Sequence, residues 1–129
     1  MSRTPRLSAL ADAWSVDAGG EEGPDWTRLR AFVDYLGRHP EEAAKAIASP
    51  PAASGSHLMD NLLAGIAEKV ADDAGLRRPS WTAQITPLDQ PWEGLGTSRT
   101  RAANAAAAPP QLAARQIFVP ASSLWRQSA

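Results

Sequence analysis

The spacing of prolines limits the fold of this chain more than any other feature, because proline lacks a backbone donor and breaks a helix interior. Pro79, Pro87 and Pro91 exclude a long helix between residues 79 and 91. The run 49–56, which combines two prolines with small residues and has no periodicity, indicates a linker. Helices are therefore expected on both sides of this linker, with an irregular segment after the second group.

Apolar residues recur at helical spacing before the linker. The pattern predicts a short amphipathic helix over 5–17 and a second over 26–36 with Asp25 as its N-cap. A weaker third helix is expected from about Pro40 to Ala48. The apolar positions that support the first two are Leu7, Leu10, Ala11 and Trp14, then Trp26, Leu29, Phe32, Val33 and Leu36.

The strongest helical pattern covers residues 57–74, and Gly75 follows it as a natural C′ residue. Farther on, the sequence predicts a helix over 99–107, a short helix from Pro110, and a brief strand at 117–119. The expected fold class is mainly α: a small helical domain with an irregular Trp-, Pro- and Arg-rich C-terminal third and room for one short strand.

The linker suggests a division of the chain. Residues 1–48 are expected to form an N-terminal helical segment, 49–56 the linker, and 57–129 a C-terminal helix with an irregular Trp/Arg-rich module. The two helical parts either fold separately or share one core, since the linker is compatible with a hinge and with a loop on one compact domain.

Charge is unevenly distributed along the 129 residues. Residues 1–75 contain 12 acidic and 7 basic side chains, a net of −5, whereas 76–129 contain 2 acidic side chains and 6 arginines, a net of +4. Arginine suits both phosphates and acidic protein surfaces, so this asymmetry concerns partners more than fold. The alternative is that the two halves of the chain pair with each other.

Cysteine is absent, which excludes disulfides and thiolate metal sites and fits a reducing compartment. The N-terminus has basic residues but no apolar run after them, and no segment approaches the roughly 20 apolar residues of a membrane helix. We therefore expect a cytoplasmic protein without membrane contact.

Candidates for catalysis are few. His39 and His57 lie beside a helix start and the linker, positions typical of solvated histidines. Three carboxylates, Glu68, Asp72 and Asp73, fall within about one and a half turns of the strongest helix. Lysine and arginine neighbours favour a solvated face with local ion pairs. We expect no catalytic residue, metal ligand or cofactor, unless these carboxylates converge on a metal ion.

Tryptophan and arginine are the residues most enriched at binding hot spots, and five tryptophans exceed what so small a core readily hides. Trp14 and Trp26 fit apolar helix faces, whereas the others lie in irregular segments. A core position is the alternative for Trp81. The predicted partner-binding residues are Trp81, Trp92, Arg99, Arg101, Arg115 and Trp125.

Direct binding of nucleic acid is the alternative use of the arginines. Arg99, Arg101 and Arg115 could contact phosphates while a tryptophan stacks on a base. The chain as a whole has no basic excess, which a DNA-binding domain usually shows. A small DNA-binding or transcription-associated regulator is therefore the second hypothesis.

A set of motifs in the C-terminal half carries a resemblance. They are Pro79-Ser80-Trp81-Thr82, Leu88-Asp89 with Trp92, Arg101, Pro110 with Leu112 and Arg115, Ile117-Phe118-Val119 and Leu124. In this order they resemble a group of actinobacterial proteins over most of residues 58–126, with a weaker likeness at Leu10–Trp14. The chain differs from that pattern at Gln116, where a glycine is expected, and it has no clear helix-turn-helix.

Members of this group occur alone or after a helix-turn-helix domain, and some look like the companion proteins of toxin–antitoxin pairs, including pairs whose toxin resembles a nucleotidyltransferase. The resemblance implies an antitoxin-like function in which the protein binds and neutralises a partner toxin. The leading hypothesis is thus a non-catalytic, mainly helical binding protein. Its acidic N-terminal helices would cover a basic cleft on the partner, and its C-terminal tryptophans and arginines would bury against it.

Overall fold

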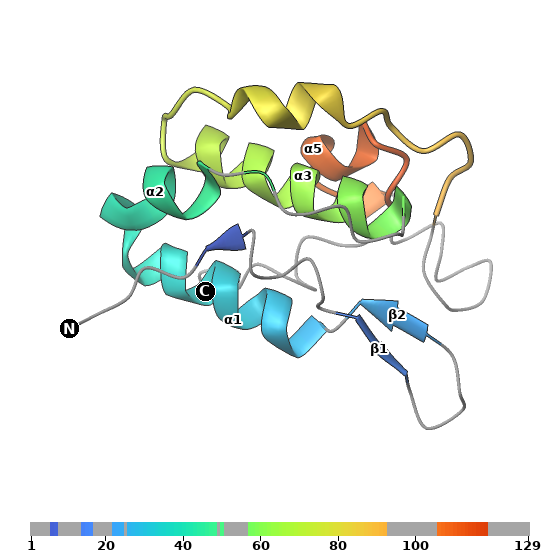
Figure 1. Ribbon diagram of the computed structural model, residues 1–129, viewed down its shortest axis with the longest axis horizontal. Coiled ribbons are helices and arrows are strands. Elements are labelled where there is room, and N and C mark those ends of the chain that lie inside the picture. The colour runs from blue at the N-terminus through green and yellow to red at the C-terminus, as the bar shows by residue number, and fades with distance from the viewer. Residues whose placement is uncertain are drawn as a thin grey trace.

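The computed structural model describes residues 6–7, 14–16, 22–24, 26–48, 50, 57–92 and 106–118. These residues form a mainly helical fold, which confirms the predicted class (Figure 1). None of the described helices combines the length and apolarity needed to span a bilayer. In chain order the elements are strands β1 (Trp14–Val16) and β2 (Glu22–Pro24), helix α1 (Trp26–Arg38), 3-10 helix η2 (Pro40–Glu42), helices α2 (Ala43–Ile47) and α3 (His57–Asp73), 3-10 helix η3 (Ser80–Gln84) and helix α5 (Pro110–Ala113).

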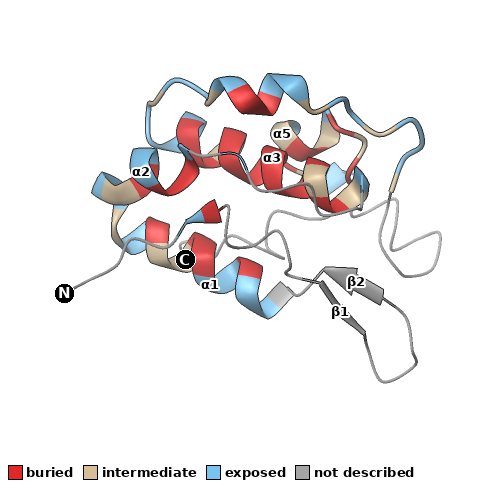
Figure 2. Cartoon of the chain, viewed as in Figure 1, coloured by how far each residue is buried: buried red, intermediate tan, exposed pale blue. Residues whose placement is uncertain are grey.

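Helix α3 is the centre of the fold. It is buried on nearly all sides between residues 59 and 71, because α2 contacts it on one side and η3 and α5 contact it on the other (Figure 2). A helix with so little exposed surface must be apolar over most of its circumference. Its buried residues are Met59, Asn61, Leu62, Leu63, Ala64, Gly65, Ile66, Ala67, Glu68, Val70 and Ala71.

Helices α1 and α2 complete the core with the apolar stripes predicted for them. Leu29, Phe32, Val33 and Leu36 of α1 are buried at i, i+3, i+4 and i+7, so that one face of the helix turns inward. The predicted third helix is present as η2 followed by α2. One hydrophobic cluster contains residues from both sides of the 49–56 run, so the described parts of the two helical segments share a core.

The predicted helix over 5–17 is wrong at its C-terminal end. Residues 14–16 form strand β1, which pairs antiparallel with β2 in the register Trp14 with Pro24 and Val16 with Glu22. The helical spacing of the apolar residues competes there with a Trp-Ser-Val alternation, and aromatic and β-branched residues favour strands. A helix this short is also marginal without strong packing.

The segment after α3 is irregular, as the prolines predicted, but it contains the short helix η3. Trp81 of η3 is buried, and its indole Nε1 donates a hydrogen bond to the carbonyl oxygen of Ile47, at 2.9 Å. The last carbonyls of a helix have no partner within it, so this indole satisfies one of the open acceptors at the end of α2. Trp81 thereby ties η3 to a helix on the other side of the 49–56 run.

Two helices end with the same backbone turn but with different residues in the left-handed position. After α3, Gly75 has φ +69° while Leu76 N–H bonds to Ala71 O and Gly75 N–H to Asp72 O. After α5, Gln116 has φ +66° while Ile117 N–H bonds to Leu112 O. Gly75 confirms the predicted C′ residue. Gln116 occupies the position where the resemblance expects a glycine, and glycine adopts this conformation at least cost.

The structure describes only part of the C-terminal segment in which a helix over 99–107, a helix from Pro110 and a strand at 117–119 were predicted. Residues 106–107 are helical, which agrees with the end of the helix predicted over 99–107, and the rest of it lies outside the described residues. α5 begins at Pro110 as predicted. In place of the strand at 117–119 there is an isolated parallel bridge between Trp92 and Ile117. Val119 and the following residues lie outside the described part of the chain.

Candidate functional site

The guanidinium of Arg115 is buried between α3, η3 and α5, with its side chain only 6% exposed. Its five N–H groups make five hydrogen bonds, which is all that an arginine can donate. Nε and one Nη2 proton bond to the two Glu68 carboxylate oxygens at 2.9 and 3.2 Å. The others bond to Asn61 Oδ1 and to the carbonyls of Ile85 and Thr82, at 2.7–2.9 Å. We call Arg115, Glu68 and Asn61 the Arg115 cluster.

Asn61 extends this cluster along the irregular segment. Its Nδ2 donates to the carbonyls of His57 and Thr86, each at 3.0 Å, while Oδ1 accepts from Arg115. The carbonyls of Ile85 and Thr86 thus accept hydrogen bonds from side chains, and the carbonyl of Thr82 accepts one from Arg115 besides its backbone bond from the Ile85 N–H. Buried backbone acceptors need a partner, so the Arg115 cluster replaces the ladder that regular secondary structure would supply.

A glycine lets α5 approach α3 closely enough to place Arg115. A Cβ atom added at Gly65 would collide with Leu112 of α5 and would lie 3.7 Å from the Arg115 Cδ atom. Asn61, Gly65 and Glu68 fall at i, i+4 and i+7, so they form one stripe of α3 that faces α5 and η3. Sequence reasoning missed this stripe, and its signal is the glycine between two polar residues at helical spacing.

One turn farther along α3 lies a second polar cluster, formed by Asp72, Arg78 and Gln111 and called here the Arg78 cluster. Arg78 donates to both Asp72 oxygens, at 3.0 and 2.6 Å, and Gln111 Nε2 donates to Oδ2 at 2.8 Å. The hydrogen bonds from Arg78 and then from Gln111 lower the pKa of Asp72 from 3.8 to about 2. The hydrogen bond to Asp72 in turn raises the pKa of Arg78. Asp72 and Arg78 are exposed, whereas Gln111 is half-buried.

The carboxylates proposed as a possible metal site do not converge. Glu68 pairs with Arg115, Asp72 with Arg78, and Asp73 with Lys69, whose Nζ lies 3.0 Å from Oδ2. Arg78 also lies 3.5 Å from Glu68 Oε2, so two arginines and a lysine pair with the three carboxylates. Local ion pairing was predicted here and is confirmed for Asp72 and Asp73, but Glu68 is buried rather than solvated.

The residues predicted to bind a partner have different positions. Trp81 and Arg115 are buried and bonded within the chain, so neither side chain is offered to a partner in this fold. Trp92 is half-buried against the core, and its backbone bonds to Gln116 and Phe118. Arg99, Arg101 and Trp125 lie outside the described residues. The DNA-binding hypothesis also loses Arg115, because all its donors are already used.

The N-terminal helices are not the acidic surface expected from the overall charge asymmetry. Residues 26–47 carry four basic and three acidic side chains. They are Arg28, Arg30, Arg38 and Lys45, against Asp34, Glu41 and Glu42. The acids of the first 75 residues are instead spread over other segments, including the C-terminal half of α3.

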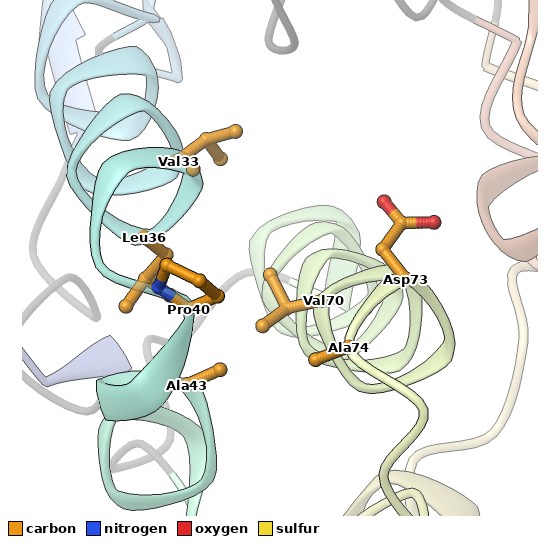
Figure 3. Close-up of a pocket in the computed structure, with 8 residues that line it drawn as sticks. Val33, Leu36, Pro40, Ala43, Val70, Asp73 and Ala74 are labelled. Carbon is orange, nitrogen blue, oxygen red and sulfur yellow. The ribbon is translucent and has the colours of Figure 1, made fainter.

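An apolar groove opens where the end of α1 and η2 face the C-terminal half of α3. Its cavity measures about 230 Å³. Figure 3 shows Val33, Leu36 and Pro40 on one side, opposite Val70 and Ala74, with the Asp73 carboxylate beside them. Asp73 is 54% exposed and can accept a further cation besides Lys69. The complete lining is Val33, Leu36, Gly37, Pro40, Ala43, Val70, Asp73 and Ala74.

A second cleft, of about 320 Å³, lies beside the two polar clusters. Its charged side chains are those that already pair with one another. Gln111 Oε1 is the one buried side-chain acceptor in the described part of the chain without a hydrogen-bond partner. The polar groups that line this cleft thus mostly have hydrogen-bond partners within the chain. The α1–α3 groove, in contrast, exposes apolar surface that no described residue covers.

One group of side chains could hold a metal ion among the described residues. It consists of His39, Glu41 and Glu42 at the junction of α1 and η2, where their ligand atoms all lie within 4.8 Å of one another. His39 directly precedes η2, and Pro40 at its start also lines the groove.

Comparisons of the chain with protein-family models, with curated proteins and with solved structures find no match.

Proposed function

We propose that this chain is a non-catalytic, antitoxin-like binding module that captures a partner toxin by taking one of its apolar side chains into the α1–α3 groove. The observation that carries the proposal is the groove itself, an apolar cavity between α1 and α3 that no described residue covers. Concave apolar sites with a few polar groups at the rim are typical of recognition sites. The antitoxin character is taken from the resemblance of the C-terminal half.

The size of the groove supports a protein partner over a small molecule. Its volume of about 230 Å³ lies below the roughly 300–1,000 Å³ typical of small-molecule pockets. A cavity of this size accommodates one large side chain, such as the aromatic or aliphatic anchors that dominate protein interfaces. The rest of the partner would then lie across the surfaces of α1 and α3.

The charge at the rim supports a basic residue next to that anchor. Asp73 lines the groove and is half exposed, and its present partner is the flexible side chain of Lys69. Exposed pairs of this kind are weak, so a partner's arginine can share or replace the lysine at little cost. The occupant is therefore an apolar anchor that neighbours a basic residue on the toxin.

Gly37 provides a test that leaves the fold intact. It lines the groove, and a Cβ atom at this position would meet nothing within 4 Å. Gly37→Leu fills the groove with the protein's own side chain and raises helix propensity in α1 by up to about 1 kcal/mol. Ala31→Leu, on the exposed side of the same helix, is the matched control.

The experiment co-expresses the tagged protein with the products of its neighbouring genes, first as wild type and then as each variant. The proposal expects a stoichiometric partner that arrests growth when expressed alone. Growth is expected to recover with the wild type and Ala31→Leu but not with Gly37→Leu. Recovery with Gly37→Leu would remove the groove from the proposal, and the absence of a stoichiometric, growth-arresting partner would remove the antitoxin function.

A further inference from the structure

The junction between α1 and η2 gathers three metal-ligating side chains within four residues. α1 ends at Arg38 and Pro40 starts η2, so His39 is the single residue between the two helices. Proline at the first helical position fixes the backbone there. The turn that follows returns the carboxylates of Glu41 and Glu42 toward the imidazole of His39.

The distances among these side chains match a small coordination sphere. His39 Nδ1 lies 3.4 Å from Glu41 Oε1 and 3.8 Å from Glu42 Oε2, and all three atoms fit within 4.8 Å. Zinc bonds to nitrogen and oxygen measure about 2.0–2.2 Å, which places neighbouring ligands of a tetrahedral ion about 3.3–3.6 Å apart. The three ligand atoms need only small side-chain rotations to reach that spacing.

Tyr35 holds two of the three ligands in place from the last turns of α1. Its hydroxyl donates to Glu42 Oε2 at 2.5 Å, and its ring packs on the His39 imidazole with centroids 4.4 Å apart. Hydrogen bonds and packing around the ligands orient metal sites and strengthen binding. Tyr35 therefore reduces the freedom that His39 and Glu42 would lose on binding an ion.

We propose that His39, Glu41 and Glu42 form a binding site for a first-row transition-metal dication, with Zn²⁺ as the reference ion. One imidazole nitrogen and two carboxylate oxygens suit Zn²⁺, whereas Mg²⁺ and Ca²⁺ prefer ligand sets made of oxygen alone. The side chains of His39 and Glu41 are 43% and 68% exposed, so water completes the coordination. Because the site adjoins Pro40, a bound ion would fix the edge of the α1–α3 groove.

The other explanation for this geometry is an ion pair between a protonated His39 and the two carboxylates. The two readings differ in what the side chains do when Zn²⁺ is added. The chain has two histidines, so the imidazole resonances of His39 and His57 can be followed separately. His57 is exposed at the start of α3 and belongs to no group of potential metal ligands in the described residues, which makes it the internal control.

The test titrates the full chain, carrying no histidine tag, with ZnCl₂ by calorimetry and by NMR of the imidazole protons. The proposal expects one site, a shift of the His39 resonances alone, and unchanged binding in His57→Ala. His39→Ala is expected to weaken binding by at least a hundredfold, and Tyr35→Phe by about tenfold. Both altered side chains are partly exposed, so circular dichroism should match the wild type.

Three results would overturn the site. The first is equal binding by the wild type and His39→Ala, and the second is a comparable shift of both histidines. The third is Mg²⁺ competing with Zn²⁺ at equal concentration, which would reduce the cluster to a diffuse acidic patch. Glu41→Gln sharpens the result, because loss of a carboxylate ligand must weaken Zn²⁺ binding if that side chain coordinates the ion.

Discussion

The Arg115 cluster and the Arg78 cluster contain the same chemical groups one turn apart on α3. Each has a carboxylate from α3, an arginine from a later segment and a side-chain amide. The Arg115 cluster is buried, whereas the Arg78 cluster is largely exposed. Water and ions can replace the exposed contacts but not the buried ones. Loss of the buried cluster is therefore expected to lower the free energy of unfolding more than loss of the exposed one.

The difference between the clusters also appears in what they hold. Arg115 bonds to backbone carbonyls of Thr82 and Ile85, so its loss would open part of the chain's interior. Arg78 bonds to side chains, with Asp72 as its main partner and Glu68 3.5 Å away. The buried arginine therefore organises the backbone, and the exposed one adjusts charge at the surface.

The largest expected effect comes from Arg115→Met. The change leaves the buried Glu68 carboxylate without its main partner and the Ile85 carbonyl without its side-chain donor, while Thr82 O keeps the Ile85 N–H; the expected cost is about 3–5 kcal/mol. Urea denaturation measures the loss. The double variant Glu68→Met/Arg115→Met leaves no buried charge and should regain part of it. If the free energy of unfolding of Arg115→Met lay within about 1 kcal/mol of the wild-type value, the Arg115 cluster would not be the major contribution to stability proposed for it.

Gly65→Ala attacks the same cluster through packing. The added methyl group would collide with the buried Leu112 and push α5, together with Arg115, away from α3. Overpacking of this kind costs about 1–3 kcal/mol, even though alanine favours a helix over glycine. Gly37→Ala is the matched control, since it meets open space and should stabilise α1 slightly. Equal urea midpoints for Gly65→Ala and Gly37→Ala would show that α5 can move to admit the methyl group without loss of stability.

Gln116→Gly should act in the opposite direction. Gln116 holds φ +66° beside Arg115, and a residue with a Cβ atom adopts this conformation at a cost of about 1 kcal/mol or more. Glycine removes that strain but has more freedom in the unfolded chain, which leaves a net gain of about 0.5–1 kcal/mol. The thermal midpoint should rise. Gly75→Ala, at the equivalent position after α3, should lower it.

Arg78→Gln tests the exposed side of the comparison and should have the smallest effect, about 0.5 kcal/mol at neutral pH. The pKa of Asp72 is lowered to about 2, so its pairing stabilises the fold above pH 3.8 and is lost as the pH falls toward 2. The stability difference between wild type and variant should therefore shrink between pH 4 and pH 2. If the stability difference stayed constant from pH 4 to pH 2, the contribution of Arg78 would not depend on the charge of Asp72.

Periodicity was sufficient to predict the long helices. The stripes in α1 and α3 repeat at helical spacing over several turns, and Gly75 marks one end correctly. The helix over 5–17 failed because four apolar residues at helical spacing are too few to exclude a strand at Trp14–Val16. Short segments depend on tertiary contacts that a local pattern does not contain.

The candidate sites were harder to predict because their parts are far apart in the sequence. Arg115 lies 47 residues after Glu68, whereas the sequence favoured local ion pairs with neighbouring lysine and arginine residues. Trp81 was predicted to face a partner, yet its indole bonds to Ile47, 34 residues earlier. The groove joins α1 to α3 across the 49–56 run. Only the group of His39, Glu41 and Glu42 is local, and there the order of residues alone did not indicate that the ligand atoms meet.

The distance between Glu68 and Arg115 also has a consequence during synthesis. At roughly 5–20 residues per second, a ribosome needs about 2–9 seconds to add the 47 residues from Lys69 to Arg115. During most of that interval the nascent chain carries a complete α3 sequence in which Glu68 has Arg78 nearby but lacks its buried partner Arg115. The helix can begin to associate with α1 and α2, but the face that packs against α5 stays exposed to solvent until Arg115 has been synthesised. A message truncated before that codon would yield a chain unable to close its interior, which proteases can recognise.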